Sequence, residues 1–466
     1  MLKVRLFAPL LVAIASVVVA ADDPAAGPDA GKPKNVPTTR EEVKAALNAL
    51  RHREPRLPLP PPTAEEIKAA RERAAAGGGA AGLGNGLVNN GRMRALHLPE
   101  ELRTNTNVRP PANPRERDPN QVFDYAFATE LFWIVSRVNN CHYCLGHQEH
   151  KLLSAGLDDD RIAALDGDWS QFTAPEQAAF AFTRKLTFEP HRINDEDINR
   201  LKAHFSDLQV FEIISLVARY NSTNRWTDSL GIPQEDHREF QTPTNPKYQK
   251  FVTSVAPIDA QRPQGVSAPA LPAERPALES RSEVEAALAR AAKRTSRLPL
   301  PEEDAARTTL GEAVASFPGS APLPNWARLM LSNPKAGAGN AVAYQVLVEK
   351  GRLNPRLKAQ IAWVAARNDR AWYALGQARQ RLRALGLSDS EIYSIDEAKD
   401  GLTAGEQQTL KFARKLTVEP QWIVDADIAN LRKFFSDSEV AEIVHRVTMA
   451  NYFDRLTEAA GLPLEE

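Results

Sequence analysis

The sequence predicts an all-α protein that contains two copies of one helical domain. Apolar residues recur at helical spacing, capping boxes mark helix starts, and no segment shows the sustained alternation of a half-buried strand. Of the 466 residues, 43% are apolar and 25% are charged, as in ordinary globular proteins. The chain therefore has enough apolar material for the cores of roughly two to four domains.

The N-terminal segment, 1–21, has the pattern of a secretory signal peptide. Lys3 and Arg5 give a basic start, the run from Leu6 to Val19 is apolar but short for a bilayer, and small residues follow at Ala20 and Ala21. An uncleaved N-terminal anchor is the alternative. We expect a periplasmic or secreted protein, and we expect no stable membrane span after this segment.

Positive and negative residues are nearly balanced. The chain has 58 Lys and Arg residues against 59 Asp and Glu residues, which gives a formal net charge of −1. Such a balance argues against a long-range field for polyanions or acidic membranes. We therefore expect no nucleic-acid partner.

The chain repeats itself at a constant offset. FAFTRKLTFEP at 180–190 matches LKFARKLTVEP at 410–420, an offset of 230, and the ungapped match continues to Pro233 and Pro463. A match this long indicates an internal duplication. A Gly-rich segment at 77–91 is interpreted as a mobile loop. The predicted organisation is a signal peptide (1–21), a disordered leader (22–40), a first domain (41–233), a Pro-rich linker (234–280) and a second domain (281–466).

Helix signals are clear inside each copy. A helix is expected over about 122–138, broken by two asparagines, and a second from near Cys141 to a C-cap at Gly156. Capping boxes begin at Thr173 and, in the second copy, at Thr403. Helical spacing follows at 193–205, with Asp195 as the expected N-cap, and at 210–220.

Cys141 and Cys144 are the two cysteines of the chain. In an exported protein they would meet an oxidising environment and could pair with each other. Their spacing places both on one face of a helix start, where backbone N–H groups and the helix dipole favour a thiolate. His147 lies three residues further along the same face and could deprotonate Cys144.

Other readings of the cysteines remain open. The pair could be a structural staple, although so short a loop gives little entropic stabilisation. Zinc would need further ligands than two cysteines and one histidine. A covalent c-type haem would need histidine directly after the second cysteine, where Leu145 stands. We therefore expect no metal and no cofactor.

The stretch around the cysteines resembles the alkylhydroperoxidase D / carboxymuconolactone decarboxylase family. The resemblance is carried by an Asn-rich turn, Cys141-His-Tyr-Cys144, a following histidine, and a helix that closes on Ala-Gly. It covers about residues 110–233 and 320–463, where the second copy has GRLNPRLK ahead of IAWVAAR. It implies two tandem alkylhydroperoxidase D-like all-α domains and a tendency to form homo-oligomers.

The resemblance also implies a chemistry. In that family the cysteine pair cycles between dithiol and disulfide while it reduces peroxides, and a glutamate and a histidine relay protons. The position of the family glutamate is occupied by Thr129 here, and that of the family histidine by Gln148. The adjacent Glu130 and His147 are therefore the candidates for the proton relay, each about 100° away around its helix.

The second copy lacks the reactive residues. At the 230 offset, the two cysteines and the histidine are replaced by Ala371, Ala374 and Gln377, whereas Tyr373 and Gly376 are kept. We interpret this copy as a redox-inactive structural partner.

The resulting hypothesis is a peroxidase of peroxiredoxin-like type that acts on a small peroxide. Cys144 attacks, Cys141 resolves (or the reverse), His147 assists deprotonation, Glu130 orients it, and an external dithiol restores the pair. Two alternatives stay open: a non-enzymatic disulfide-stapled scaffold or binding module, and a carboxymuconolactone decarboxylase-like lyase that uses polar residues of either copy.

Overall fold

The structure is a computed structural model that describes residues 36–75, 87–103, 113–119, 121–235, 277–317, 322–397 and 401–465. Its regular elements are all helices within these ranges, which confirms the all-α prediction. The predicted signal peptide, residues 22–35 of the predicted leader, most of the Gly-rich segment and residues 236–276 of the predicted linker lie outside the described residues.

Nine α-helices lie in the part of the chain up to residue 235, which we call the first half. They are α1 (Arg40–Ala49), α2 (Ala64–Ala75), α3 (Asn89–His97), α4 (Tyr125–Val138), α5 (His142–Ser154), α6 (Asp159–Ala164), α7 (Ala174–Phe188), α8 (Asp195–Lys202) and α9 (Asp207–Ser229), as far as the structure describes this part.

Ten α-helices lie among the described residues from 277 to 465, which we call the second half. They are α10 (Arg281–Ala292), α11 (Glu303–Leu310), α12 (Asn325–Met330), α13 (Gly337–Glu349), α14 (Pro355–Asp369), α15 (Trp372–Ala384), α16 (Asp389–Ser394), α17 (Ala404–Val418), α18 (Asp425–Arg432) and α19 (Asp437–Ala460). The starts of α14 to α19 match those of α4 to α9, one by one, at the 230 offset of the sequence repeat.

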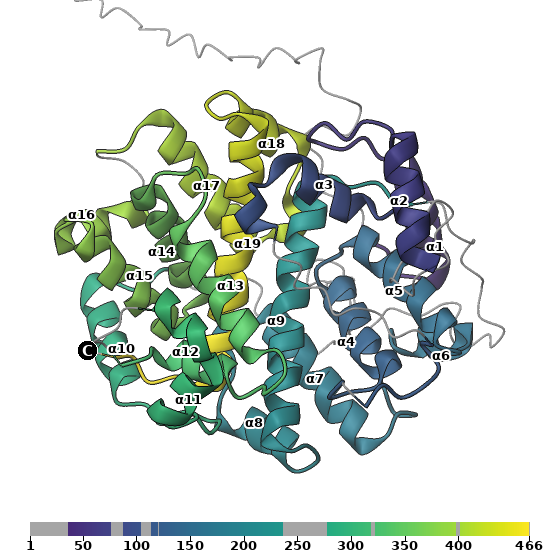
Figure 1. Cartoon of the computed structure of the whole chain (residues 1–466), viewed down its shortest axis with the longest axis horizontal. Coiled ribbons are helices and arrows are strands. Elements are labelled where there is room, and N and C mark those ends of the chain that lie inside the picture. Colours follow the sequence, from purple (N-terminus) through teal and green to yellow (C-terminus); the bar gives the residue numbers. More distant parts are fainter. Residues whose placement is uncertain are drawn as a thin grey trace, which may run out of the picture.

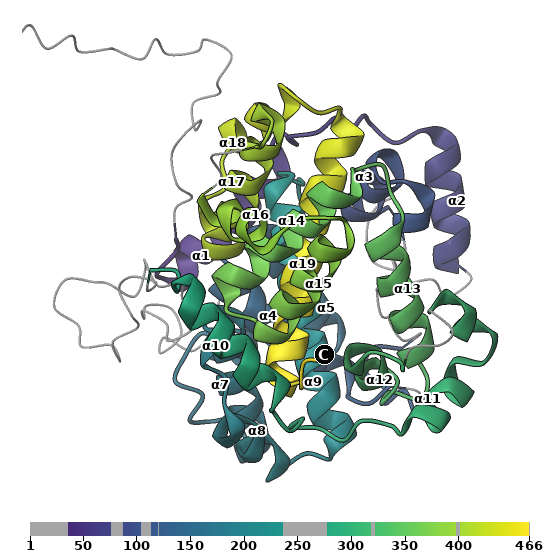
Figure 2. The same ribbon diagram turned by 90° about the vertical axis from the view of Figure 1, so that its left-hand side faces the viewer.

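The long helices α9 and α19 lie side by side at the centre of the molecule (Figure 1; Figure 2). In Figure 1, α4 to α7 lie on one side of this pair, and α14 to α16 lie on the other. Buried residues of both halves form one continuous hydrophobic core. Since the halves share a core, their division into two separate domains stays a prediction.

Contacts between the halves occur in reciprocal pairs. Arg56 Nε donates to Asp425 Oδ1 at 2.6 Å, and its counterpart Arg297 Nε donates to Asp195 Oδ1 at 2.6 Å. Each arginine begins an RLPLP sequence, which occurs at 56–60 and again at 297–301, and the two aspartates are equivalent at the 230 offset. Reciprocal contacts of this kind are the pattern of a two-fold-related interface.

The predicted helix caps agree with the structure to within about one residue. Both capping boxes, at Thr173 and Thr403, are confirmed. Helix α5 ends before Gly156, which has a φ of +92°. The predicted N-cap at Asp195 is wrong by one residue: Asn194 is the cap, because its side chain accepts from the backbone N–H of Asp197.

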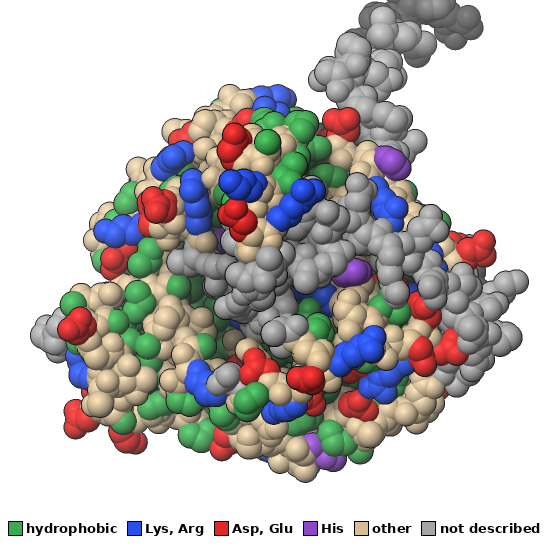
Figure 3. Space-filling view, turned by 45° about the vertical axis from the view of Figure 1, so that its right-hand side comes forward, with side chains coloured by type: hydrophobic (Ala, Val, Ile, Leu, Met, Phe, Trp, Pro, Cys, Tyr) green, Lys and Arg blue, Asp and Glu red, His purple; other side chains and the backbone are tan. Residues whose placement is uncertain are grey.

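The surface carries mixed charge. On the face shown in Figure 3, Lys and Arg side chains are interspersed with Asp and Glu, in agreement with the balanced composition. Of the helices that the structure describes, none combines the length and the apolar character needed to cross a bilayer.

Candidate redox site

The turn between α4 and α5 positions the cysteines. Asn139 caps the end of α4, and its side-chain amide donates to Asn221 Oδ1 and Asn224 Oδ1 of α9 at 3.0 and 3.1 Å. Asn140 follows with a φ of +52°, a left-handed conformation that asparagine tolerates better than most residues. The chain then enters α5 with Cys141 as its N-cap.

Both thiols converge on one hydroxyl group of α9. Cys141 Sγ and Cys144 Sγ lie 3.3 and 3.2 Å from Thr227 Oγ1, and Cys141 also hydrogen-bonds to Cys144. The cysteines are 1% and 2% exposed, and Thr227 is fully buried. The structure therefore brings the two sulfurs together, as their spacing predicts, in a site closed to bulk water.

Burial decides the ionisation of this pair. It raises the pKa of the Cys144 thiol well above its usual value; the adjacent Cys141 raises it further, while Thr227 and Asn224 oppose the shift. The expectation that the helix start favours a thiolate is therefore wrong for this site, because burial disfavours the charged form of the thiol. A nearby base must accept the proton before Cys144 can react.

His147 lies in a hydrogen-bonded group with Glu235. The two are joined by a bond of 2.6 Å between His147 Nε2 and Glu235 Oε2, and the Tyr143 hydroxyl donates to Glu235 Oε1 at 2.7 Å. Burial alone would raise the pKa of Glu235, but His147 and the donated hydrogen bonds lower it. The carboxylate is therefore held ionised beside the imidazole.

The tail after α9 brings Glu235 to this place. The chain reverses at Gly231, which has a φ of +64°, and residues 232–235 return over α5. Gly146 leaves room for the tail, since a Cβ there would lie 2.7 Å from Gln234 Oε1. The N–H of Asn89, at the start of α3, donates to Glu235 Oε1 at 2.5 Å. Residues 234 and 235, the first two of the predicted linker, thus lie against α5.

Glu130 lies in a different environment from that predicted. Its carboxylate accepts from Arg161 Nε at 3.0 Å, and Arg161 also bonds Glu176 of the α7 capping box. Burial raises the pKa of Glu130 to about 7, although Arg161 opposes this. The structure pairs His147 with Glu235, so the expected orienting role of Glu130 is not supported.

The two residues at the family positions make local contacts. Thr129 Oγ1 donates to the carbonyl oxygen of Tyr125 at 2.6 Å, and Gln148 Nε2 donates to the carbonyl oxygen of Cys144 at 2.9 Å. Sequence reasoning missed Glu235 itself. The signal that could have found it is the repeat, because the 230 offset continues past Pro233 to pair Glu235 with Glu465.

The second half repeats this arrangement without the reactive groups. Tyr373 OH donates to Glu465 Oε1 at 2.8 Å, and Gln377 Nε2 donates to Glu465 Oε2 at 2.8 Å, where the first half has histidine. The N–H of Asn325, at the start of α12, also donates to Glu465. The carboxylate group is thus part of the shared scaffold, whereas the thiols and the imidazole occur in the first half alone.

The second half has two buried aspartates where the first half has asparagines near the cysteines. Asp369 and Asp454 stand where the first half has Asn139 and Asn224. Asp369 Oδ2 pairs with Arg455 at 2.7 Å, both fully buried. Asp454 lines a small cavity with Ala374 and Gln377, and its Oδ2 has no hydrogen-bond partner. Burial, and then the charge of Asp369, raise the pKa of Asp454 well above its usual value.

Metal ligation finds no support in the geometry. No cluster of three or more His, Cys, Asp or Glu side chains suited to a metal ion occurs in the ranges that the structure describes. The arrangement can instead exchange protons and electrons, through two adjacent thiols and a carboxylate-oriented imidazole.

Comparisons with known proteins give distant likenesses. No family model matches the chain. The uncharacterized protein YdfG of Bacillus subtilis (strain 168) is 28% identical over 101 residues, which are 21% of this chain and 68% of YdfG. The crystal structure of the debrominase Bmp8 in complex with 2,3,4-tribromopyrrole is 18% identical, with a TM-score of 0.32, and the match covers 36% of this chain and 90% of that chain. These likenesses assign neither a family nor an activity to this chain.

Proposed function

We propose that this protein is a thiol-dependent oxidoreductase that reduces a small peroxide through Cys141 and Cys144. The observation that carries the proposal is the convergence of both thiols on the Thr227 hydroxyl, at 3.3 and 3.2 Å. Two sulfurs held side by side at a helix start can form a disulfide without a large movement of the backbone.

The proposed cycle has three steps. The Cys144 thiolate attacks the peroxide O–O bond, which gives a cysteine sulfenic acid and releases the alcohol or water. The Cys141 thiol then attacks that sulfur, so that the disulfide forms and the sulfenic oxygen leaves as water. An external dithiol reduces the disulfide by exchange and is itself oxidised. The opposite order, with Cys141 attacking first, balances in the same way.

In this scheme His147 accepts the thiol proton, and Glu235 replaces Glu130 as the group that orients it. The support is the 2.6 Å bond between His147 Nε2 and Glu235 Oε2, which holds the ring in place. A base of this kind is needed because burial disfavours the Cys144 thiolate.

Membership of the alkylhydroperoxidase D / carboxymuconolactone decarboxylase family, export and homo-oligomer formation are part of the same proposal. They rest on the Cys141-His-Tyr-Cys144 motif, on the apolar N-terminal segment and on the family resemblance. The duplication is the basis for the further proposal that the second half serves as a structural partner.

A second candidate is a structural disulfide. It is favoured by one observation: the cysteines are 1% and 2% exposed, which limits access for a peroxide or a reductant. A disulfide with this role would resist reduction by dithiothreitol in the folded protein.

The deciding experiment measures peroxide consumption by the purified full-length chain with excess dithiothreitol. Turnover in the native protein, lost in Cys144→Ser and in Cys141→Ser, is the expected result. Turnover equal to the thiol background, with both cysteines shown to be reduced by mass spectrometry, would refute the peroxidase. Activity on any substrate that survives both substitutions would indicate the lyase instead.

A further inference from the structure

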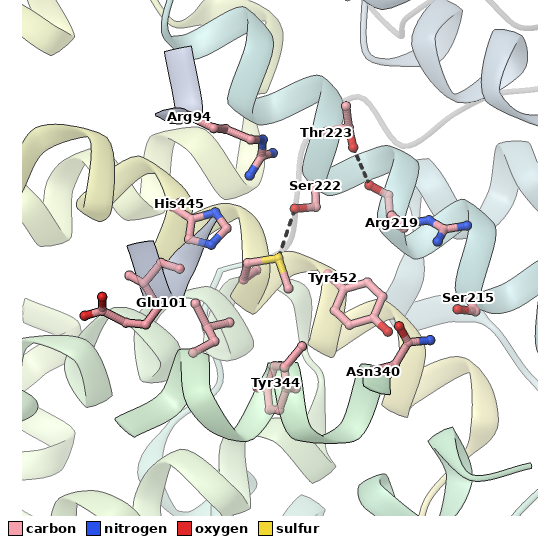
Figure 4. Close-up of a pocket in the computed structure, with 14 residues that line it drawn as sticks. Arg94, Glu101, Ser215, Arg219, Ser222, Thr223, Asn340, Tyr344, His445 and Tyr452 are labelled. Atoms are coloured by element: carbon pink, nitrogen blue, oxygen red, sulfur yellow. Dashed lines mark hydrogen bonds between the residues drawn. The ribbon is translucent and has the colours of Figure 1, made fainter. Parts of the chain in front are cut away.

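A pocket lies between the halves, against the central helices α9 and α19 (Figure 4). With the solvent at its mouth, it holds about 720 Å³ of empty space. Helix α3, the short 3₁₀ helix η2 (Glu100–Leu102) and α13 complete its walls. Six of its lining residues bear on what it could bind: Arg94, Ser222, Thr223, Tyr344, His445 and Tyr452.

The pocket is built from unlike residues at equivalent positions. At the 230 offset of the repeat, Ser215 corresponds to His445, and Ser222 corresponds to Tyr452. All four line the pocket, so it lies where the two halves meet. Because the equivalent residues differ, the two sides of the pocket are chemically different. Such a pocket can hold a ligand in one orientation.

Arg94 brings a positive charge into this pocket. Its guanidinium carbon lies 4.6 Å from the ring centroid of Trp226, and burial lowers its pKa to about 10, so it stays charged at neutral pH. No described residue forms a hydrogen bond or an ion pair with this guanidinium group. Glu101 also lines the pocket, but Figure 4 shows its carboxylate pointing away from Arg94. A cation so placed favours an anionic ligand.

His445 lies beside Arg94 in the wall of the pocket (Figure 4). It is 5% exposed, and its Nδ1 is buried without a hydrogen-bond partner. Burial, and then the charges of Arg94 and Arg446, lower its pKa well below the usual value. The ring is therefore neutral at pH 7 and has an unused hydrogen-bonding atom, a state that a ligand can satisfy.

The other walls carry the polar side chains of Ser215, Arg219 and Asn340 together with apolar and aromatic side chains. Tyr344 and Tyr452 contribute rings, and Met449 and Leu347 contribute apolar side chains. Burial raises the pKa of Tyr452 to about 12, so its hydroxyl stays neutral. A pocket of this composition takes a ligand with an apolar body and one charged end.

We propose that this pocket binds a small organic carboxylate, with its anionic group at Arg94 and its apolar body against Tyr344 and Tyr452. Arginine recognises carboxylates through two parallel N–H donors, and the neutral His445 can add a hydrogen bond. The proposal is independent of the thiol chemistry, although the pocket lies close to it: Thr223 in its wall is one helical turn from Thr227.

The test is a titration calorimetry comparison of phenylacetate with its uncharged isostere phenylacetamide. The full-length protein should bind phenylacetate roughly ten- to hundredfold more tightly, the range of a charge-assisted hydrogen bond. Arg94→Gln should remove this preference, whereas Arg200→Gln, an exposed arginine on α8, should keep it. Added salt should weaken phenylacetate binding to the native protein but leave phenylacetamide binding unchanged.

Two results would overturn the proposal: equal binding of the two probes, or no binding of phenylacetate at millimolar concentration. The salt dependence needs no variant, so the test stands even where Arg94→Gln fails to fold. Cys144→Ser should bind phenylacetate as the native protein does. A failure of the peroxidase and a failure of this carboxylate site are therefore separate outcomes.

Discussion

Thr227 should control the ionisation of the cysteine pair. In the resting state its hydroxyl donates to the backbone oxygen of Thr223 at 3.1 Å, while both sulfurs lie close enough to donate to it. When Cys144 loses its proton, the hydroxyl can turn and donate to the sulfur. A hydrogen bond to a charged group contributes roughly 1.5–3 kcal/mol, and the neutral bond given up contributes roughly 1 kcal/mol.

Thr227→Val removes this donor and nearly preserves the shape of the side chain. The net loss of about 0.5–2 kcal/mol corresponds to a roughly two- to thirtyfold smaller thiolate fraction at pH 7. Ultraviolet absorbance of the thiolate, followed against pH, should show the titration of the pair moved to higher pH. Alkylation by iodoacetamide should be slower by the same factor.

Thr457→Val is the matched control. Thr457 is the counterpart of Thr227, fully buried, and donates to the backbone oxygen of Phe453 at 2.8 Å, but Ala371 and Ala374 stand in this half where the first half has its cysteines. This variant should leave the thiolate titration unchanged. An equal shift in both variants, or no shift in Thr227→Val, would refute the role of the Thr227 hydroxyl.

Buried polar groups elsewhere in the molecule give three further predictions. His147→Gln should keep the melting temperature within a few degrees, because Gln377 makes the same contact at 2.8 Å, but it should abolish peroxide turnover, measured with excess dithiothreitol. Burial raises the pKa of Glu130 to about 7, so the folded state binds the Glu130 proton more tightly than the unfolded state does. The stability gained from this proton is full below about pH 4.5 and is lost as the pH rises to about 7. In Glu130→Gln, the melting temperature measured by calorimetry should therefore depend less on pH across that window. Arg455→Met should lower the free energy of unfolding in urea by roughly 3–5 kcal/mol, since it leaves Asp369 buried without its partner, and adding Asp369→Asn should recover part of that loss.

The local part of the fold is readable from the sequence. Thr173 and Thr403 predict helix starts because a capping box is made of residues three positions apart. Gly156 predicts a helix end for a similar reason. The wrong N-cap at Asp195 is also a local error of one residue. Asn194 and Asp195 are both residue types that cap helices well, and the hydrogen bond from the N–H of Asp197 identifies Asn194 as the cap.

The site is readable only in part, because its groups come from distant segments. The spacing of Cys141 and Cys144 predicts a shared helix face, and both sulfurs do meet at Thr227. The tail that brings Glu235 to His147 passes over α5 from 88 residues away, and no local pattern encodes that contact. Burial of the thiols depends on the same packing, so the local sequence predicts the wrong direction for the pKa shift of Cys144.

The repeat separates what supports the scaffold from what performs chemistry. Tyr143 with Glu235 and Tyr373 with Glu465 form the same hydrogen bond in each half, at 2.7 and 2.8 Å. The shared bond therefore holds the tail against the helix and cannot by itself explain a redox activity. What the first half adds is an imidazole on that carboxylate, where Gln377 of the second half can hold the contact but cannot take a proton at neutral pH. The imidazole on the shared carboxylate thus occurs in the half that has the thiols, which is where a proton acceptor is needed.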